Sequence, residues 1–136
     1  MEQRDLIKDQ IEQLGRALGK MVTLVLGMDN GGDILGIQKE VAATFDTELK
    51  LDFKKLIGLE QKEFQQTIKE KFQNQEAVLE QLSSLLFELG KRCGPEGELR
   101  QQYVEKALWT LEYVNSISDT FSMERLGKIN IIKQWI

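Results

Sequence analysis

The chain has 136 residues, of which 41% are hydrophobic and 29% are charged, and its formal net charge is −4. This size and composition are typical of a single globular domain, and the acidic balance argues against nucleic acid as a partner, because nucleic-acid-binding proteins usually carry a basic excess. With no histidine and one cysteine, Cys93, the chain lacks the commonest general base and metal ligand and cannot form an intramolecular disulfide.

The N-terminal sequence is acidic and polar and has none of the features of a signal or transit peptide. The longest apolar stretch, from Met21 to Leu26, is far too short to span a bilayer. A single cysteine fits a reducing compartment, and we expect Cys93 to be a small core residue at a helix end. These features predict a cytoplasmic protein with no transmembrane segment.

The first 48 residues have the pattern of a helical hairpin. Apolar residues three and four apart predict a helix over 2–27: Ile7, Ile11, Leu14, Leu18, Met21 and Val25. Beyond Lys20 this helix is apolar nearly all round, so we expect its second half to be buried. The seam is expected to pack on this chain's own helices, although a coiled-coil partner would also fit it. A Gly-rich turn follows, and Asp33 is the expected cap of a helix over 34–48.

The segment 49–73 reads as an insertion of short helices. Asp52 is the expected cap of the first one, and the second is a very polar helix that packs through Leu59, Phe64 and Ile68. The segment 74–136 then contains three helices, over 75–92, 98–117 and 122–135. No segment alternates with period two, so no strand is expected. The predicted fold class is therefore all-α, built from antiparallel helical hairpins within a single domain spanning 1–136.

Two details of the C-terminal helices can be compared directly with a structure. Asn74 is the expected cap of the helix over 75–92, and Asp119, Thr120 or Ser122 is the expected cap of the last helix. The last helix is expected to pack inward through one register of apolar residues: Leu126, Ile129, Ile132 and Ile136.

The dipeptide Leu-Gly occurs six times, which is more than composition alone would give. A glycine inside a helix costs about 1 kcal/mol relative to alanine. We therefore expect a neighbouring backbone to approach closely at the glycines within helices, namely Gly15, Gly19, Gly90 and Gly127.

The C-terminal half resembles the tetratricopeptide repeat, in which a large apolar residue and Leu-Gly in one helix precede a helix centred on alanine. Here Leu86 is followed by Leu89-Gly90, Ala107 lies in the sequence YVEKAL, and Leu126-Gly127 repeats the first dipeptide 37 residues later. The resemblance implies a right-handed α-α array over 74–136. The opening sequence RDLIKDQIEQLGRALGKM, together with this half, also resembles a family of small uncharacterised bacterial helical proteins, and that resemblance implies no known activity.

The sequence contains no recognisable catalytic, cofactor-binding or metal-binding constellation. Glu76, Glu80 and Glu88 are expected to form a solvated helix face. Trp109, Tyr113 and Trp135 are the candidate partner-binding residues, because aromatic side chains dominate binding hot spots; packing inside the chain is the alternative for each of them.

The sequence therefore predicts a non-enzymatic protein–protein interaction or scaffold module without a cofactor. Its partner would be an unidentified protein or a second copy of the chain, in which case the protein is a homodimer. Two alternatives stay open: a self-associating structural protein with no ligand, and a small carboxylate-dependent enzyme.

Overall fold

The computed structural model describes the backbone of residues 2–28, 34–93 and 97–136, and the side chains of these ranges from residue 9 onward. Within these ranges the chain is helical and contains no strand, so the predicted all-α fold class is confirmed. The elements are α1 (Glu2–Leu26), α2 (Ile34–Thr44), the π-helical turn η1 (Phe45–Leu49), α3 (Phe53–Ile57), α4 (Gln61–Phe72), α5 (Glu76–Arg92), α6 (Glu98–Ile117) and α7 (Met123–Lys133).

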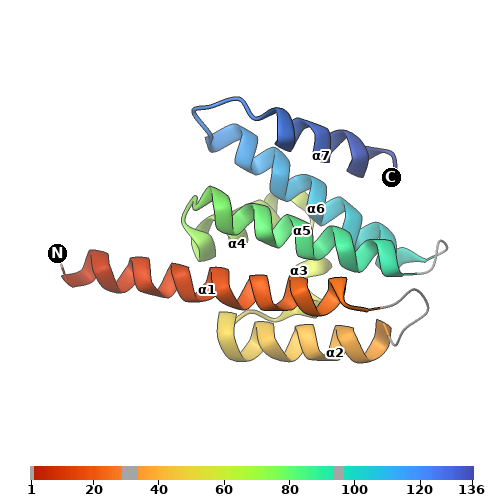
Figure 1. Ribbon diagram of the computed structural model, residues 1–136, viewed down its shortest axis with the longest axis horizontal. Helices are drawn as coiled ribbons and strands as arrows, with labels where there is room; N and C mark the ends of the chain where they lie inside the picture. The colour runs from red at the N-terminus through yellow and green to blue at the C-terminus, as the bar shows by residue number, and fades with distance from the viewer. Residues whose placement is uncertain (1, 29–33, 94–96) are drawn as a thin grey trace.

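The five α-helices outside the insertion form a row in the order α2, α1, α5, α6, α7 (Figure 1). The two helices of the insertion, α3 and α4, lie behind this row and contact α6. Helices α1 and α5 run in the same direction, whereas α2, α6 and α7 are each antiparallel to the neighbour that precedes them in the chain. The most extensive contact between two elements joins α5 to α6, and the next joins α1 to α5.

Several predicted helix ends are confirmed. The helix over 98–117 has the predicted bounds, and the helix expected over 34–48 continues through α2 into η1, where Phe45 and Leu49 are both fully buried. The Asp52 carboxylate accepts a hydrogen bond from the Lys55 amide at 3.2 Å, and the Ser122 hydroxyl accepts one from the Arg125 amide at 3.1 Å. The expected cap Asp33 lies outside the described residues.

The prediction that Asn74 caps the helix after it was wrong. Asn74 has a left-handed backbone with φ 60°, and α5 begins after Gln75 without a side-chain cap. Asparagine tolerates this conformation better than most residues, so Asn74 forms the turn itself. Its Oδ1 atom accepts a hydrogen bond from the Tyr113 hydroxyl instead of from the helix.

The seam of α1 is buried against the body of the protein, but the second half of this helix is not buried all round. Leu18 and Val25 are fully buried, whereas Leu24 is 39% exposed and Leu26 is 54% exposed. The side chain of Ile7 lies outside the described residues. The expected all-round burial was therefore wrong, because α2 covers only part of the face that α5 leaves open.

Gly90 allows α5 and α6 to approach closely, as expected. A Cβ atom on Gly90 would lie 2.8 Å from Cγ2 of Val104 and 3.2 Å from Cβ of Tyr103, both on α6. Gly15 and Gly19 also face α5, but an added Cβ would meet only side-chain atoms there, of Val78 at 3.3 Å from Gly15 and of Gln81 at 3.5 Å from Gly19, so the expected approach of a backbone is not found at these two positions. The expectation was wrong for Gly127, because a Cβ there would meet nothing within 4 Å.

The register of α7 also differs from the one expected. Ile129 and Ile132 are buried, but Leu126 is 40% exposed and Ile136 is also exposed. The inward position next to Leu126 is taken by Arg125, which is 5% exposed. The helix is thus rotated to bury an arginine, and this rotation turns Leu126 and Gly127 outward.

The two glycines should respond in opposite ways to alanine. In Gly90→Ala the new Cβ meets Val104, and overpacking of this kind costs about 1–3 kcal/mol, which exceeds the gain in helix propensity of about 1 kcal/mol. Gly127→Ala makes no contact and should raise the free energy of unfolding by up to about 1 kcal/mol. Urea unfolding at low protein concentration measures both changes.

Val104→Ala supplies the control, because it removes the methyl group that the new Cβ would meet. In that background Gly90→Ala should cost less than in the wild type. Equal stability of Gly90→Ala and the wild-type protein would show that α5 and α6 do not pack closely at this point.

Candidate functional site

Three adjoining hollows form a groove along α1, which we call the α1–α2 groove. The central hollow has a volume of about 520 Å³. It shares Leu24 with a hollow of about 580 Å³ toward the C-terminal end of α1, and it shares Gln13 and Glu48 with one of about 290 Å³ toward the N-terminal end. The groove therefore follows α1 from residue 10 to its end and continues along the two residues after it, to residue 28. Figure 1 shows the directions of α1 and α2.

The two walls of the groove arise from helical spacing in two antiparallel segments. On one wall, Ile37, Glu40, Thr44 and Glu48 recur every three or four residues through α2 and η1. On the other wall, α1 contributes Gln13, Arg16, Ala17, Lys20, Met21 and Leu24. Residues at these spacings share one face of a helix, so each wall is a single continuous helix face.

In the two hollows between α1 and α2 the floor is apolar and the two rims carry opposite charge, whereas the third hollow is lined beyond Glu48 by two further cations, Lys50 and Lys71. Ala17 and Met21 are buried beneath the groove, and Leu24 is exposed within it. Arg16 and Lys20 stand on the α1 rim, while Glu40 and Glu48 stand on the opposite rim.

No ion pair joins the two rims among the described residues. Arg16 pairs along its own helix with Glu12 at 3.7 Å, in a largely exposed pair. The ammonium group of Lys20 and the carboxylates of Glu40 and Glu48 have no charged partner within the described part of the chain. Lys20, Glu40 and Glu48 are thus free to pair with a segment that lies between the rims.

Sequence reasoning missed this groove because Leu24 and Leu26 look like core residues. The pattern of charges in the sequence could have indicated the groove. Arg16 and Lys20 lie one turn apart on the first helix. Glu40 and Glu48 lie two turns apart on one face of the next helix. Opposite charges on two helices of one hairpin suggest ion pairs across the hairpin, and the structure does not form them.

Two of the predicted partner-binding residues, Trp109 and Tyr113, lie together on the side of α6 that faces α4. Trp109 is half-buried, with its ring centroid 6.1 Å from that of Phe64 in an edge-on contact. Tyr113 is also half-buried and donates its hydroxyl proton to Asn74. It borders a polar hollow of about 480 Å³ that α4 lines with Gln and Lys side chains.

The third predicted residue, Trp135, lies elsewhere and does not meet the other two. Its ring centroid is 5.7 Å from that of Phe87 on α5, and the guanidinium carbon of Arg100 on α6 lies 4.4 Å from it. The ammonium of Lys91 stacks in turn over Phe87 at 5.3 Å. Cations over aromatic rings contribute about 0.5–2 kcal/mol each, so this cluster holds the C-terminal end of the chain against α5 and α6.

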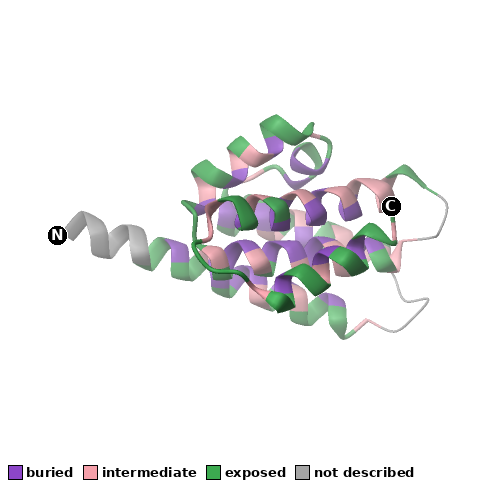
Figure 2. Cartoon of the chain, turned by 90° about the horizontal axis from the view of Figure 1, so that it is seen from above, coloured by how far each residue is buried: buried purple, intermediate pink, exposed green. Residues whose placement is uncertain are grey.

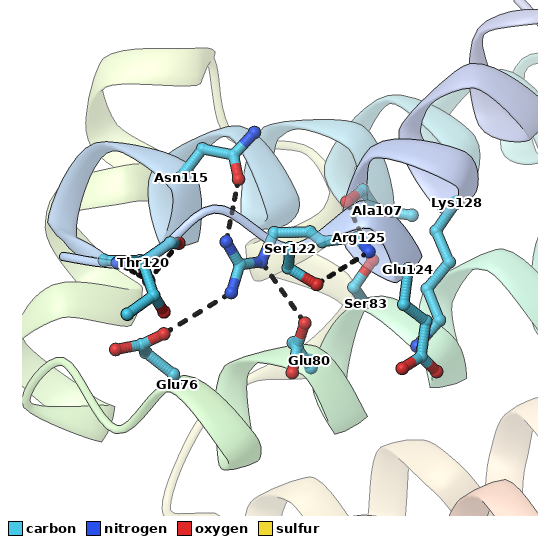
Figure 3. A network of polar contacts seen from close by, with 11 residues as sticks. Glu76, Glu80, Ser83, Ala107, Asn115, Thr120, Ser122, Glu124, Arg125 and Lys128 are labelled. Carbon is cyan, nitrogen blue, oxygen red and sulfur yellow. Dashed lines mark hydrogen bonds and ion pairs between the residues drawn. The ribbon is translucent and has the colours of Figure 1, made fainter.

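The carboxylates of Glu76, Glu80 and Glu88, which were predicted to form a solvated helix face, each form an ion pair with an arginine. Arg125 reaches from α7 to Glu76 at 3.4 Å and to Glu80 at 3.3 Å (Figure 3). It also donates to the Asn115 side-chain oxygen at 2.9 Å. Glu88 pairs with Arg92 at 2.6 Å and with Lys91 at 3.3 Å. Glu76 and Glu80 therefore hold α7 against α5, whereas the pairs of Glu88 lie within α5 itself.

Removing the Arg125 charge should destabilise the protein. Breaking a buried ion pair costs 3–5 kcal/mol when a buried charge is left behind. Here the remaining acids are partly solvated, with side chains 43% and 32% exposed, so we expect Arg125→Met to cost about 2–3 kcal/mol. The measurement is urea unfolding at neutral pH.

A cation on the same helix provides the matched control. Lys128 pairs with Glu124 at 3.8 Å at the surface, and exposed pairs contribute at most about 1 kcal/mol. Lys128→Met should therefore change stability by less than about 0.5 kcal/mol. If both variants lost the same stability, the network at Arg125 would not determine how α7 docks.

Burial shifts the pKa values of four groups, among them Tyr113, whose pKa it raises. Burial raises the pKa of the Cys93 thiol, to which Gln38 donates a weak hydrogen bond at 3.7 Å. Burial lowers the pKa of Lys106, and neighbouring Glu105 acts in the opposite direction. The Lys106 ammonium lies 4.6 Å from the centroid of the Trp109 ring. Burial also raises the pKa of Tyr103 well above its ordinary value.

The Tyr103 shift predicts a change of stability in alkali. A pKa raised by folding means that the folded state favours the protonated phenol, so this stabilisation is complete below the unfolded pKa of about 10 and is lost as pH rises above it. The free energy of unfolding of the wild type should fall above pH 10 by up to about 1.4 kcal/mol per unit more steeply than that of Tyr103→Phe. Urea titrations from pH 7 to 11 test this, and parallel curves would contradict it.

Comparison of the chain with family models, with curated proteins and with solved structures gave no match. In the described ranges no group of three or more Cys, Asp or Glu side chains is placed to hold a metal ion. None of the helices within the same ranges has both the length and the hydropathy that crossing a membrane requires.

Proposed function

We propose that this chain is a non-enzymatic protein–protein interaction module that receives an amphipathic segment of its partner in the α1–α2 groove. The observation that carries the proposal is the combination of an apolar floor with rims of opposite charge, on which Lys20, Glu40 and Glu48 have no charged partner among the described residues. Grooves of this kind accept a helix that presents apolar residues at helical spacing to the floor. The partner is therefore a protein segment and not a small molecule.

The charges of the groove specify the chemistry of that segment. It carries acidic residues on the edge that lies along Arg16 and Lys20, and basic residues on the edge that lies along Glu40 and Glu48. Its apolar residues, three and four apart, lie over Met21 and Leu24. Charge placed in this way fixes orientation and excludes other partners more than it adds affinity.

We further propose that the C-terminal half is a tetratricopeptide-like, right-handed α-α array. In its support, α1 and α5 run parallel, and each is followed by an antiparallel helix, α2 and α6 respectively (Figure 1). Gly90 and the buried Ala107 lie where two such helices pack closely. Gly127 does not support a tetratricopeptide-like array, because none of the described residues of another helix would contact a Cβ at this position.

An enzyme that uses carboxylates is the weaker proposal, because Glu76, Glu80 and Glu88 are occupied by arginine. The half-buried free thiol of Cys93 supports a reducing, cytoplasmic location. The proposed partner-binding roles of Trp109, Tyr113 and Trp135 stay predictions. For Trp135 a partner would have to compete with Phe87 and Arg100.

A peptide-display selection tests the groove directly. Random peptides of about 20 residues, long enough for five to six helical turns, are selected on the wild-type protein, and affinities are measured by calorimetry. We expect enriched peptides with apolar residues at helical spacing. Leu24→Asp places a charge on the floor and should weaken their binding at least tenfold, and Lys20→Glu should weaken binding of those with an acidic edge.

Leu126→Asp is the matched control, because Leu126 on α7 is as exposed as Leu24, at 40% against 39%. This variant should bind the peptides as tightly as the wild type. The proposal fails if no sequence pattern is enriched, or if Leu24→Asp and Leu126→Asp bind equally well.

A further inference from the structure

The large hydrophobic side chains that are exposed gather at the two ends of the row of helices. Among the described residues, α3, α4, α5 and α6 contribute none of them. One group, Leu24, Leu26 and Leu35, belongs to α1 and α2 at the groove end. The other group belongs to α7 and the residues beside it: Phe121, Met123, Leu126, Ile131 and Ile136. Phe121 and Met123 are each 74% exposed.

The outer face of α7 is uncharged along its centre. Successive residues of a helix are rotated by about 100°, so the face opposite Arg125, Ile129 and Ile132 is centred on Gly127 and Gln134. Met123, Asn130 and Ile131 lie beside this centre, and Leu126 lies at one edge of the face, next to Lys133. Figure 2 looks onto this end of the row and shows the outer side of α7 largely exposed. Charged side chains stand only at the two edges, Glu124 and Lys128 on one and Lys133 on the other.

Gly127, at the centre of this face, makes no close contact with another helix among the described residues. It lies inside a regular helix, where glycine is unfavourable, and nothing approaches the position of its missing Cβ. Gly90 shows what such a glycine does elsewhere in this protein, because there a second helix lies directly against it. A second helix from outside the chain would give Gly127 the same role.

The edge charges identify that helix as a second copy of α7. Glu124 and Lys128 lie one turn apart, and Leu126 lies midway between them along the helix. An antiparallel copy related by a two-fold axis at Leu126 therefore brings Glu124 opposite Lys128 of the other copy, and the reverse. The two Lys133 side chains stand about 20 Å apart along the helix axis in that arrangement and do not repel strongly.

We propose that the protein forms a symmetric dimer in which the outer face of α7 packs antiparallel on the same face of a second copy, with Leu126 next to its own counterpart. The contact is isologous, as in most homodimers. Because α7 is a helix of 11 residues, the contact is small, and we expect weak and reversible association in the micromolar range.

Sedimentation over a hundredfold range of protein concentration tests the dimer. The wild type should change from monomer to dimer, and Leu126→Asp should raise the dissociation constant at least tenfold. Leu24→Asp, at the other end of the row, should leave it unchanged. Glu124→Lys and Lys128→Glu should each weaken association, and the variant that combines both should restore it.

Gly127→Ala separates the proposed contact from a purely structural role. It should unfold at higher urea concentration than the wild type at low protein concentration, and yet associate more weakly, because the new Cβ lies between the two helices. An alanine variant that associates as strongly as the wild type would contradict close packing at Gly127.

Thiol cross-linking establishes the geometry. In a Cys93→Ser background, Leu126→Cys should form a covalent dimer with a short bifunctional thiol reagent, because the two Cα atoms lie about one interaxial distance apart, ~8–10 Å, which is beyond the reach of a direct disulfide. Leu35→Cys, which is exposed at the groove end, should not cross-link. A wild type that stays monomeric, or cross-linking only in a mixture of Leu126→Cys with Leu35→Cys, would overturn the proposal; the second result would indicate head-to-tail stacking.

Discussion

The close contact of α5 with α6 at Gly90 is the constraint on which the rest of the structure depends. Helix α5 lies in the middle of the row, and α1 packs on one of its sides while α6 packs on the other. Because Gly90 has no Cβ, Val104 and Tyr103 fit directly against the α5 backbone. This contact sets the position of α6, and through it that of Asn115 and of the helices α3 and α4 that pack behind.

Arg125 determines how α7 is placed on α5 and α6. A guanidinium that is 5% exposed must be paired to be tolerated, and Glu76, Glu80 and Asn115 provide its partners from two different helices. The rotation of α7 that satisfies Arg125 also buries Ile129 and Ile132. The same rotation exposes Leu126 and Gly127, so one buried cation decides which residues the end of the row presents to a partner.

The sequence predicted the helices, their approximate ends and the close approach at Gly90, because these depend on local spacing and on the cost of glycine within a helix. It could not predict the outcome at Gly127, because a Leu-Gly dipeptide carries no information about which neighbour, if any, lies beside it. Glu76 and Glu80 at helical spacing and Arg125 in an apolar register were visible, but their pairing depends on the tertiary positions of three helices. The groove was missed because Leu24 and Leu26 look like core residues in the sequence, and only the packing of the helices decides that both stay exposed.

The two ends of the row are suited to complementary roles. A dimer through α7 would leave both α1–α2 grooves free, because each groove lies at the far end of its own row from the two-fold axis. Two grooves held on one rigid frame bind a partner that carries two suitable segments far more tightly than one groove does, without any new contact. Weak association at α7 would then couple groove occupancy to protein concentration, and this coupling requires no catalytic group. Glu76 and Glu80 of α5 already hold α7 in place through Arg125, so these acids serve the frame on which both ends of the row depend.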